Sequence, residues 1–288
     1  MDSGSAVIGE MAYAKINLAL HVRHRRPDGF HELESLFAFA EEGDVLRASA
    51  REDGAIRLTI DGPFADGLNA GSDNLVVRAA IALQAGSGTG QGADIVLTKY
   101  LPIASGIGGG SADAAAALRM LDRLWDLRTG DARLLAIADP LGSDVPACVV
   151  SRTLVGTGRG EALDVRELPG LAAMPLLLVN PGVALSTGPV FRGWDGVDRG
   201  AMNASSLEAI VKGGRNDLQP PAIALVPEIG AVIEVLSALP GVTLARMSGS
   251  GATCFALFDD EGARDRAADH IGAAHSGWWV MATRIRGA

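Results

Sequence analysis

The chain has 288 residues, of which 48% are hydrophobic and 20% are charged, and its formal net charge is −9. This composition is typical of a globular protein with a sizeable core, and its 37 non-periodic glycines exclude a collagen-like structure. The acidic net charge disfavours nucleic acid as a partner but allows a phosphorylated ligand, which backbone amides and a few cations can bind locally.

The first part of the chain is predicted to be rich in β-strands. Residues 12–21 alternate, which predicts a strand with one buried face and places Lys15 and Asn17 together on the other face. A helix capped at residues 72–73 is predicted to run to about Gln84. Further strands are predicted at residues 34–40, 45–48, 56–60 and 94–99.

Beyond residue 100, strands and helices are expected to mix without strict alternation. Helices are predicted at residues 111–126, 131–138, 187–192, 205–212, 227–239 and 261–271. Strands are predicted at residues 149–155, 162–165, 176–179, 243–247, 253–258 and 278–285. This order favours an α+β fold over a doubly wound sheet. We predict two lobes, residues 1–160 and residues 161–288, with a cleft between them that holds the active site.

The sequence shows no pattern of export, metal binding or membrane insertion. Residues 1–11 carry two acidic residues and lack a basic region followed by an apolar run, which argues against a signal peptide. No stretch is long and apolar enough to span a bilayer. Cys148 and Cys254 lie among apolar residues without metal-ligand spacing and are expected to be buried, reduced thiols. We therefore expect a cytoplasmic protein that does not act at a membrane.

The glycine-rich stretch at residues 102–113 is the most informative segment, since it follows a predicted strand and opens a predicted helix. Its glycines permit positive φ and leave N–H groups uncovered, and the start of the helix adds unpaired N–H groups and a dipole. We predict positive φ at Gly109, where valine would be strained and would crowd a phosphate. Ser111 could bind a phosphate oxygen or Mg²⁺. The stretch indicates a phosphate site, with a plain glycine hinge as the alternative.

Two other phosphate motifs fit this stretch poorly. A Walker A loop needs Lys followed by Ser or Thr after its last glycine, and neither is present. Gly106, Gly108 and Gly110 approach the G-x-G-x-x-G pattern of dinucleotide-binding folds without matching it. Residues 248–251 (SGSG) form a second glycine loop, which is either a hairpin turn or a loop that packs near bound phosphates.

Three motifs together resemble the GHMP kinases, a family of small-molecule kinases. They are residues 14–18 (AKINL), the glycine-rich residues 102–113, and residues 248–252 (SGSGA). Their order and separation fit the family and span nearly the whole chain, so the combination is more specific than any single loop. The resemblance implies a two-lobed α+β fold and the transfer of the γ-phosphate of Mg²⁺-ATP to an alcohol.

Four further segments resemble the branch of this family that acts on a cytidine diphosphate-linked methylerythritol. Residues 26–31 (RPDGFH) resemble its cytidine-binding segment, and residues 142–146 (GSDVP) resemble its catalytic aspartate motif. The other two segments are residues 181–191 and 216–218. Phe30 stands where this branch usually has tyrosine; its ring can stack on cytosine but lacks the phenolic hydrogen bond. Ser143 replaces a usual alanine, and Ala112 replaces a common serine.

The resemblance implies a role for each matched residue, and it assigns no Mg²⁺ ligand. Asp144 would orient the acceptor hydroxyl and accept its proton, while Lys15 would pair with Asp144 and keep it ionised. Taken alone, Asp144 is more typical of a helix N-cap or a turn than of a catalytic residue, and Lys15 is more typical of a solvated lysine on a strand. The residues implied to bind ATP are Asn74, Lys99, Pro102, Ile103, Ala104, Ser105, Gly106, Ile107, Gly108, Gly109, Gly110, Ser111 and Ala112. The residues implied to bind the acceptor are Asn17, Phe30, His31, Thr187 and Phe191.

The implied reaction phosphorylates the 2-hydroxyl of the cytidyl substrate, in non-mevalonate isoprenoid biosynthesis, by a monomer or homodimer. Three alternatives are another GHMP kinase (for homoserine or a mevalonate derivative), a GHMP-fold sensor without turnover, and a dinucleotide-binding oxidoreductase. The segment around His31 argues against the first alternative. The presence of both Lys15 and Asp144 argues against the second, and the loop spacing argues against the third.

Overall fold

The computed structural model describes residues 6–287, so the signal-peptide prediction lies in part outside the described residues. The chain forms two compact units that draw on interleaved parts of the sequence. The first contains the chain up to Ala14, Glu42–Ile103 and Gly109–Val150; the second contains Lys15–Glu41, Ala104–Gly108 and the chain from Ser151 onward. The units therefore do not follow a single division of the chain, and the lobe boundary at residue 160 stays a prediction.

Strands of the first unit form a sheet with one parallel pair. Residues 45–51, in the second half of β2 (His31–Arg51), pair antiparallel with β4 (Gly92–Thr98). β4 pairs in parallel with β3 (Ile56–Asp61). A parallel pair needs a crossover, and helix α1 (Leu75–Ser87) provides it.

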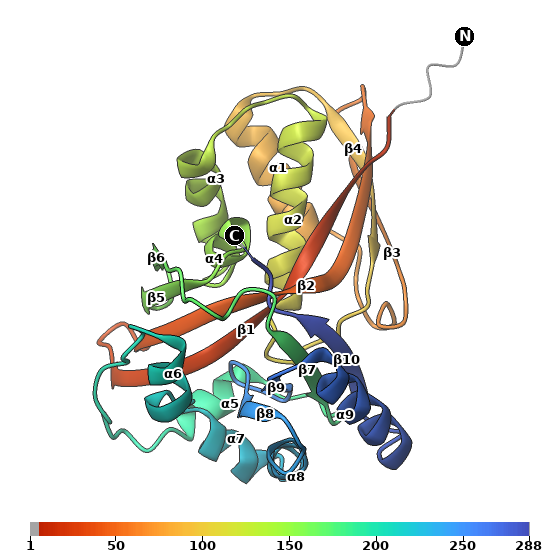
Figure 1. Ribbon diagram of the computed structural model, residues 1–288. Coiled ribbons are helices and arrows are strands. Elements are labelled where there is room, and N and C mark those ends of the chain that lie inside the picture. Colours follow the sequence, from red (N-terminus) through yellow and green to blue (C-terminus); the bar gives the residue numbers. More distant parts are fainter. Residues whose placement is uncertain (1–5, 288) are drawn as a thin grey trace. The chain divides into compact units, whose positions relative to one another are not determined.

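Helices of the first unit pack around α2 (Gly109–Leu124), which lies beside α1 (Figure 1). The others are α3 (Asp131–Ala138), the 3₁₀-helix η1 (Asp139–Leu141) and α4 (Val145–Val150). The buried residues of α2 include Ala112, Ala114, Ala115, Ala116 and Ala117. Because alanine side chains are short, α1 and α4 can pack close to the α2 backbone.

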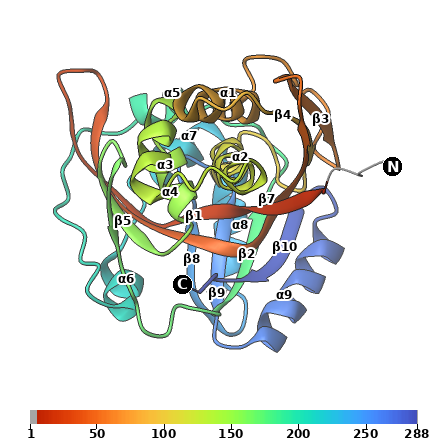
Figure 2. The same ribbon diagram turned by 90° about the horizontal axis from the view of Figure 1, so that it is seen from above.

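The second unit contains most of β1 (Ile8–Arg25) and an antiparallel sheet in the order β10-β7-β9-β8. These strands are β7 (Pro175–Asn180), β8 (Val242–Met247), β9 (Cys254–Phe258) and β10 (Trp279–Arg284). In addition, the first half of β2 pairs with β5 (Leu154–Gly158), and β5 pairs with β6 (Ala162–Val165). The helices are α5 (Thr187–Arg192), α6 (Leu207–Gly213), α7 (Gln219–Leu225), α8 (Glu228–Ser237) and α9 (Glu261–Ala274). Figure 2 shows α9 alongside β10.

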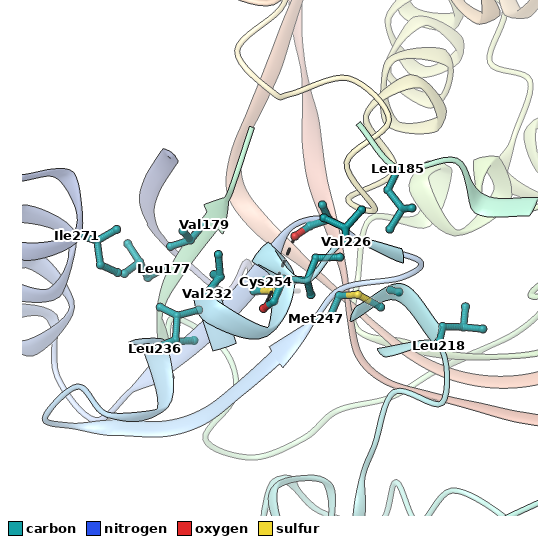
Figure 3. Close-up of a cluster of buried hydrophobic side chains, with 14 of the residues drawn as sticks. Leu177, Val179, Leu185, Leu218, Val226, Val232, Leu236, Met247, Cys254 and Ile271 are labelled. Atoms are coloured by element: carbon teal, nitrogen blue, oxygen red, sulfur yellow. Dashed lines mark hydrogen bonds between the residues drawn. The ribbon is translucent and has the colours of Figure 1, made fainter. Parts of the chain in front are cut away.

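A cluster of buried apolar side chains forms the core of the second unit (Figure 3). β7 contributes Leu177 and Val179, which are two residues apart and so lie on the same face of the strand. Cys254 lies in the same cluster, where burial raises the pKa of its thiol. Cys148 is also buried, and both cysteines are free, which confirms the prediction of buried thiols.

Most predicted elements are present, but the structure corrects several boundaries. A single strand, β2, spans the two strands predicted at residues 34–40 and 45–48. The strand predicted at residues 149–155 is wrong at its start, because α4 extends to Val150 and β5 begins at Leu154. Helix α7 was not predicted from the sequence, and it carries two prolines in its first turn. Proline fits the first turn of a helix because the N–H groups there have no intrahelical partner.

The ends of α1 also differ from their predicted positions. Its N-cap is Asn74 rather than residues 72–73, because Asn74 Oδ1 accepts a hydrogen bond from the Val76 N–H over 2.9 Å. The helix continues past Gln84 to Ser87, and its C-cap is Gly88, which has a φ of 72°. Glycine adopts this left-handed conformation at low cost, so it stops the helix there.

Candidate active site

Lys15 and Asn17 lie on one face of β1, and this face is buried like the opposite, apolar face. Lys15 is 3% exposed and Asn17 is 2% exposed, so the prediction of a strand with only one buried face is wrong. The Lys15 ammonium donates a hydrogen bond to Asn17 Oδ1 over 2.9 Å and lies 5.0 Å from the centre of the Phe37 ring. Buried charges persist when they are paired or hydrogen-bonded, which excludes the solvated strand lysine.

Asn17 connects β1 to both glycine loops within the second unit. Its side-chain amide donates to Ser35 Oγ over 2.7 Å, and its backbone N–H donates to Ser248 Oγ over 3.1 Å. Ser248 in turn donates from Oγ to the Gly106 carbonyl over 3.0 Å. The position of Asn17 is therefore set by the same contacts that hold the loops.

The second glycine loop packs directly on residues 104–108 of the first. A Cβ at Gly106 would lie 2.5 Å from the Ser248 carbonyl oxygen, and a Cβ at Gly249 would lie 2.7 Å from the Gly106 carbonyl oxygen. The Thr253 N–H donates to the Ser105 carbonyl over 3.0 Å. Glycine is required where two backbones approach this closely, so the second loop is more than a hairpin turn.

The backbone of the glycine-rich stretch uses positive φ at Gly106 (76°) and Gly108 (64°). The prediction of positive φ at Gly109 is wrong, because α2 begins there, two residues earlier than predicted. A Cβ at Gly109 would lie 3.5 Å from Lys99 Nζ, which is an ordinary contact. Backbone strain on substitution by a larger residue is therefore expected at Gly106 and Gly108, and not at Gly109.

The other residues predicted to bind ATP in this stretch differ in exposure. Ile103 and Ala104 are exposed, and Ser111 is half-buried. The buried members are Pro102, Ser105, Ile107 and Ala112. The exposed part of the loop is accessible from solvent, while the start of α2 adds N–H groups that lack intrahelical partners.

Lys99 lies at the end of β4, in the first unit, and its side chain is 4% exposed. Its ammonium donates to Asp44 Oδ2 over 2.5 Å and to Asp113 Oδ2 over 2.7 Å. Burial alone would lower the pKa of Lys99, but Asp113 and Asp44 outweigh it and raise that pKa. Burial raises the pKa of Asp113 to about 7, with Asp44 adding to the shift and Lys99 opposing it. The predicted role of Lys99 near adenine stays a prediction.

Asp144 and Asn74 both lie next to helix starts in the first unit. Asp144 directly precedes α4, is half-buried, and accepts a hydrogen bond from the Cys148 N–H at its backbone carbonyl. Asn74 caps α1, and its side-chain amide donates to the Asn69 carbonyl over 2.8 Å. The structure thus assigns Asn74 a capping role, and its contact with ATP stays a prediction.

An aromatic group in the second unit contains two of the predicted acceptor-binding residues. The His31 ring lies 5.0 Å from the Phe191 ring and 5.7 Å from the Trp194 ring, with the Trp194 ring nearly perpendicular to it. Burial, and then the nearby Arg25, lower the pKa of His31 below its ordinary 6.5. A lowered pKa favours the neutral ring, which can both donate and accept a hydrogen bond.

Phe30 and Thr187 complete the predicted acceptor-binding residues. The Phe30 ring is 55% exposed, and the Arg159 guanidinium lies 5.4 Å from its centre. Thr187, at the first turn of α5, shares a hydrogen bond of 2.9 Å with Ser250 Oγ in the second glycine loop. Both side chains are open to a ligand in the second unit.

Several of these partners were not predicted from the sequence. They are Ser35, Asp44, Asp113, Arg159 and Trp194. The sequence could have indicated Asp113 as a buried, paired carboxylate, because it is a charged residue within the alanine run on the buried side of α2. The others come from segments with no local pattern that would bring them to these positions.

No group of three His, Cys, Asp or Glu side chains that could hold a metal ion is found within residues 6–287. Within the same range, no helix has the length and apolar character needed to cross a membrane.

Models of the two GHMP kinase domains match the chain. The N-terminal domain model matches residues 74–152, and the C-terminal domain model matches residues 200–276. The chain belongs to the GHMP kinase family, and its fold is the α+β fold with two domains that the sequence predicts.

Within this family, the chain is similar over its length to proteins called 4-diphosphocytidyl-2-C-methyl-D-erythritol kinase. It is 53% identical to the protein of that name from Rhizorhabdus wittichii, over an aligned region that covers 96% of this chain and 94% of the relative. It is 50% identical to the one from Sphingopyxis alaskensis, over an aligned region that covers 98% of this chain and 100% of the relative.

Solved structures agree with these relatives. A crystal structure of 4-(cytidine 5'-diphospho)-2C-methyl-D-erythritol kinase matches with a TM-score of 0.81 and 34% identity, covering 98% of this chain and all of the other. A homoserine kinase from Cytophaga hutchinsonii matches with a TM-score of 0.77, covering 100% of this chain and 98% of the other, but at 20% identity. The second match shows a shared fold alone.

Proposed function

We propose that this protein transfers the γ-phosphate of ATP to the 2-hydroxyl of 4-diphosphocytidyl-2-C-methyl-D-erythritol, in non-mevalonate isoprenoid biosynthesis. The observation that carries the proposal is the similarity to enzymes of that name, at 53% identity over 96% of the chain. The aromatic group of His31, Phe191 and Trp194 supports it, because a pyrimidine base can stack on and hydrogen-bond to such side chains. We further propose a cytoplasmic monomer or homodimer acting on this small molecule.

ATP is the phosphate donor in this proposal. The glycine loop and the N-terminus of α2 supply backbone N–H groups, which hold phosphates without the desolvation cost of a buried cation. Mg²⁺ bound to the nucleotide would neutralise charge on the transferred group. The chain fits an ion held mainly by phosphates and water, since residues 6–287 contain no cluster of three metal-binding side chains.

Phosphoryl transfer requires the acceptor hydroxyl to be oriented and to lose its proton. Asp144 is proposed to do both, because it is a half-buried carboxylate that a ligand can reach. Lys15 is proposed to stabilise the negative charge that develops, and its burial keeps water from screening that charge. Asn17 is proposed to orient the Lys15 ammonium, which it binds directly.

The proposed function predicts which alcohols this protein phosphorylates. With Mg²⁺-ATP, the cytidyl methylerythritol substrate should be turned over rapidly, and homoserine and mevalonate poorly. The measurement is ADP release over this panel, with a reaction lacking acceptor as the control. Turnover of homoserine at a comparable kcat/KM would contradict the assignment, and ATP binding without turnover of any acceptor would favour a sensor.

Phe30 gives a prediction about recognition of cytosine. Phe30→Ala should raise KM for the cytidyl substrate by about 5- to 150-fold, since stacking of a base on an aromatic ring contributes roughly 1–3 kcal/mol. Phe30→Tyr should be tolerated. Because the ring is 55% exposed, its loss should leave the fold intact. Leu225→Ala removes a similarly exposed apolar side chain (50%) and is the matched control. An alanine variant with unaltered KM would remove Phe30 from the site.

A further inference from the structure

Three buried charged side chains of the first unit meet at the two ends of the glycine-rich stretch. Lys99 directly follows β4 and precedes the stretch, and Asp113, in α2, is the last residue of the stretch. Asp44 comes from β2 and is fully buried. The Lys99 ammonium donates to both carboxylates, so one cation links the strand and the helix that flank the stretch.

The entrance to the stretch is held firmly by Asp44. Asp44 Oδ1 accepts the N–H groups of Tyr100, over 2.6 Å, and Leu101, over 2.9 Å, while its other oxygen binds Lys99. The Lys99 backbone is itself fixed, since its N–H donates to the Asp61 carbonyl over 2.8 Å. Both carboxylate oxygens of Asp44 therefore have an assigned partner.

The exit from the stretch is held less completely. Asp113 Oδ2 accepts from Lys99, but Asp113 Oδ1 is buried without a hydrogen-bond partner among the described residues. The start of α2 lies against the same cluster, because a Cβ at Gly109 would be 3.5 Å from Lys99 Nζ and 3.9 Å from Asp44 Oδ2. The cluster thus contacts both ends of the stretch.

We propose that Asp44 and Asp113 are positioning residues for ATP, which act through Lys99 to hold the end of β4 and the start of α2 at a fixed spacing. Burying three charges is costly and adds little stability by itself, whereas directional hydrogen bonds do fix geometry. A phosphate-binding loop works only if its N–H groups are held in place before the ligand arrives. The proposal rests on the proposed binding of ATP to this stretch.

Identical Asp→Asn changes at the two carboxylates should have different effects. At Asp44, either orientation of the amide turns its NH₂ group toward an N–H donor, from Lys99 or from the backbone. Asp44→Asn should therefore raise the Kd for ATP by about tenfold or more, because small misplacements at a site have large effects. At Asp113, the amide oxygen can bind Lys99 while the NH₂ group takes the unpartnered position, so the Kd for ATP should rise at most about threefold.

A second pair of variants decides the question if Asp44→Asn does not fold. Asp113→Ser cannot reach Lys99 but leaves a neutral buried pair of Lys99 and Asp44. It should fold and raise the Kd for ATP by about three- to tenfold, more than Asp113→Asn does. Asp122→Asn, on the same helix about 13 Å away, is the matched control and should leave the Kd unchanged.

The measurements are calorimetric titration with ATP, thermal unfolding of each variant, and KM for the acceptor. A rise in the Kd for ATP, with acceptor KM within about threefold of wild type, is the result expected of positioning residues at the nucleotide. An unchanged Kd for ATP in folded Asp44→Asn or Asp113→Ser would overturn the inference. Wild-type protein that does not bind ATP would instead contradict the proposed function.

Discussion

Replacing Asp144 by asparagine is expected to lower kcat by about 10²–10⁴-fold, the usual cost of losing a general base. The amide has nearly the same shape, but it cannot accept the proton of the acceptor hydroxyl and carries no charge. Asp131→Asn, an exposed aspartate in the first turn of α3, undergoes the same chemical change and should retain full activity. The measurement is kcat at saturating substrates, and a near-normal value for Asp144→Asn would refute its catalytic role.

Lys15 extends this experiment to a double-mutant cycle. Lys15→Met keeps an unbranched apolar stem near Phe37 and Gly108 but removes the ammonium. If Lys15 and Asp144 act as one unit, the double variant should be little slower than the slower single variant. ATP affinity should largely survive in all three, since the glycine loop is proposed to make most phosphate contacts. Strictly multiplicative losses in kcat would instead show two independent contributions.

Gly106→Ala is expected to destabilise the protein and to weaken ATP binding together. The residue has a φ of 76°, and a Cβ would lie within 2.6 Å of the carbonyl oxygens of Ser248 and Gly251. The left-handed conformation and the overpacking together cost about 2–5 kcal/mol in the free energy of unfolding. The two loops must separate to admit the methyl group, which displaces the N–H groups proposed to bind phosphate.

Gly170→Ala is a control that separates the cost of the left-handed backbone conformation from the cost of contact between the two loops. Gly170 belongs to the same unit and has a φ of 86°, but a Cβ there would meet nothing within 4 Å. Its substitution should therefore cost only the conformational part, about 1–2 kcal/mol, and leave the Kd for ATP unchanged. Denaturant unfolding and calorimetry of both variants are the measurements. Equal effects of the two substitutions would show that contact between the loops contributes nothing.

Local patterns in the sequence were enough to predict much of the fold. Helix α3 and strand β6 have the bounds that the sequence predicts, since each is a short periodic segment between turn residues. The predictions were least accurate where the local pattern is interrupted although a strand continues or a helix begins. Residues 40–45 interrupt the pattern of β2 although the strand continues, and α7 begins with two prolines that resemble a loop.

The sequence by itself determined the family, the two glycine loops and the candidate catalytic residues, because each depends on residue types at short, fixed spacing. Only the tertiary structure decided how the loops meet and what Lys99 binds. Asp44 is 55 positions from Lys99, and Ser248 is 231 positions from Asn17, so no local pattern links them. Burial of both faces of β1 likewise depends on what packs against the strand. These contacts form only when distant segments pack together, because most buried polar groups must find a hydrogen-bond partner there.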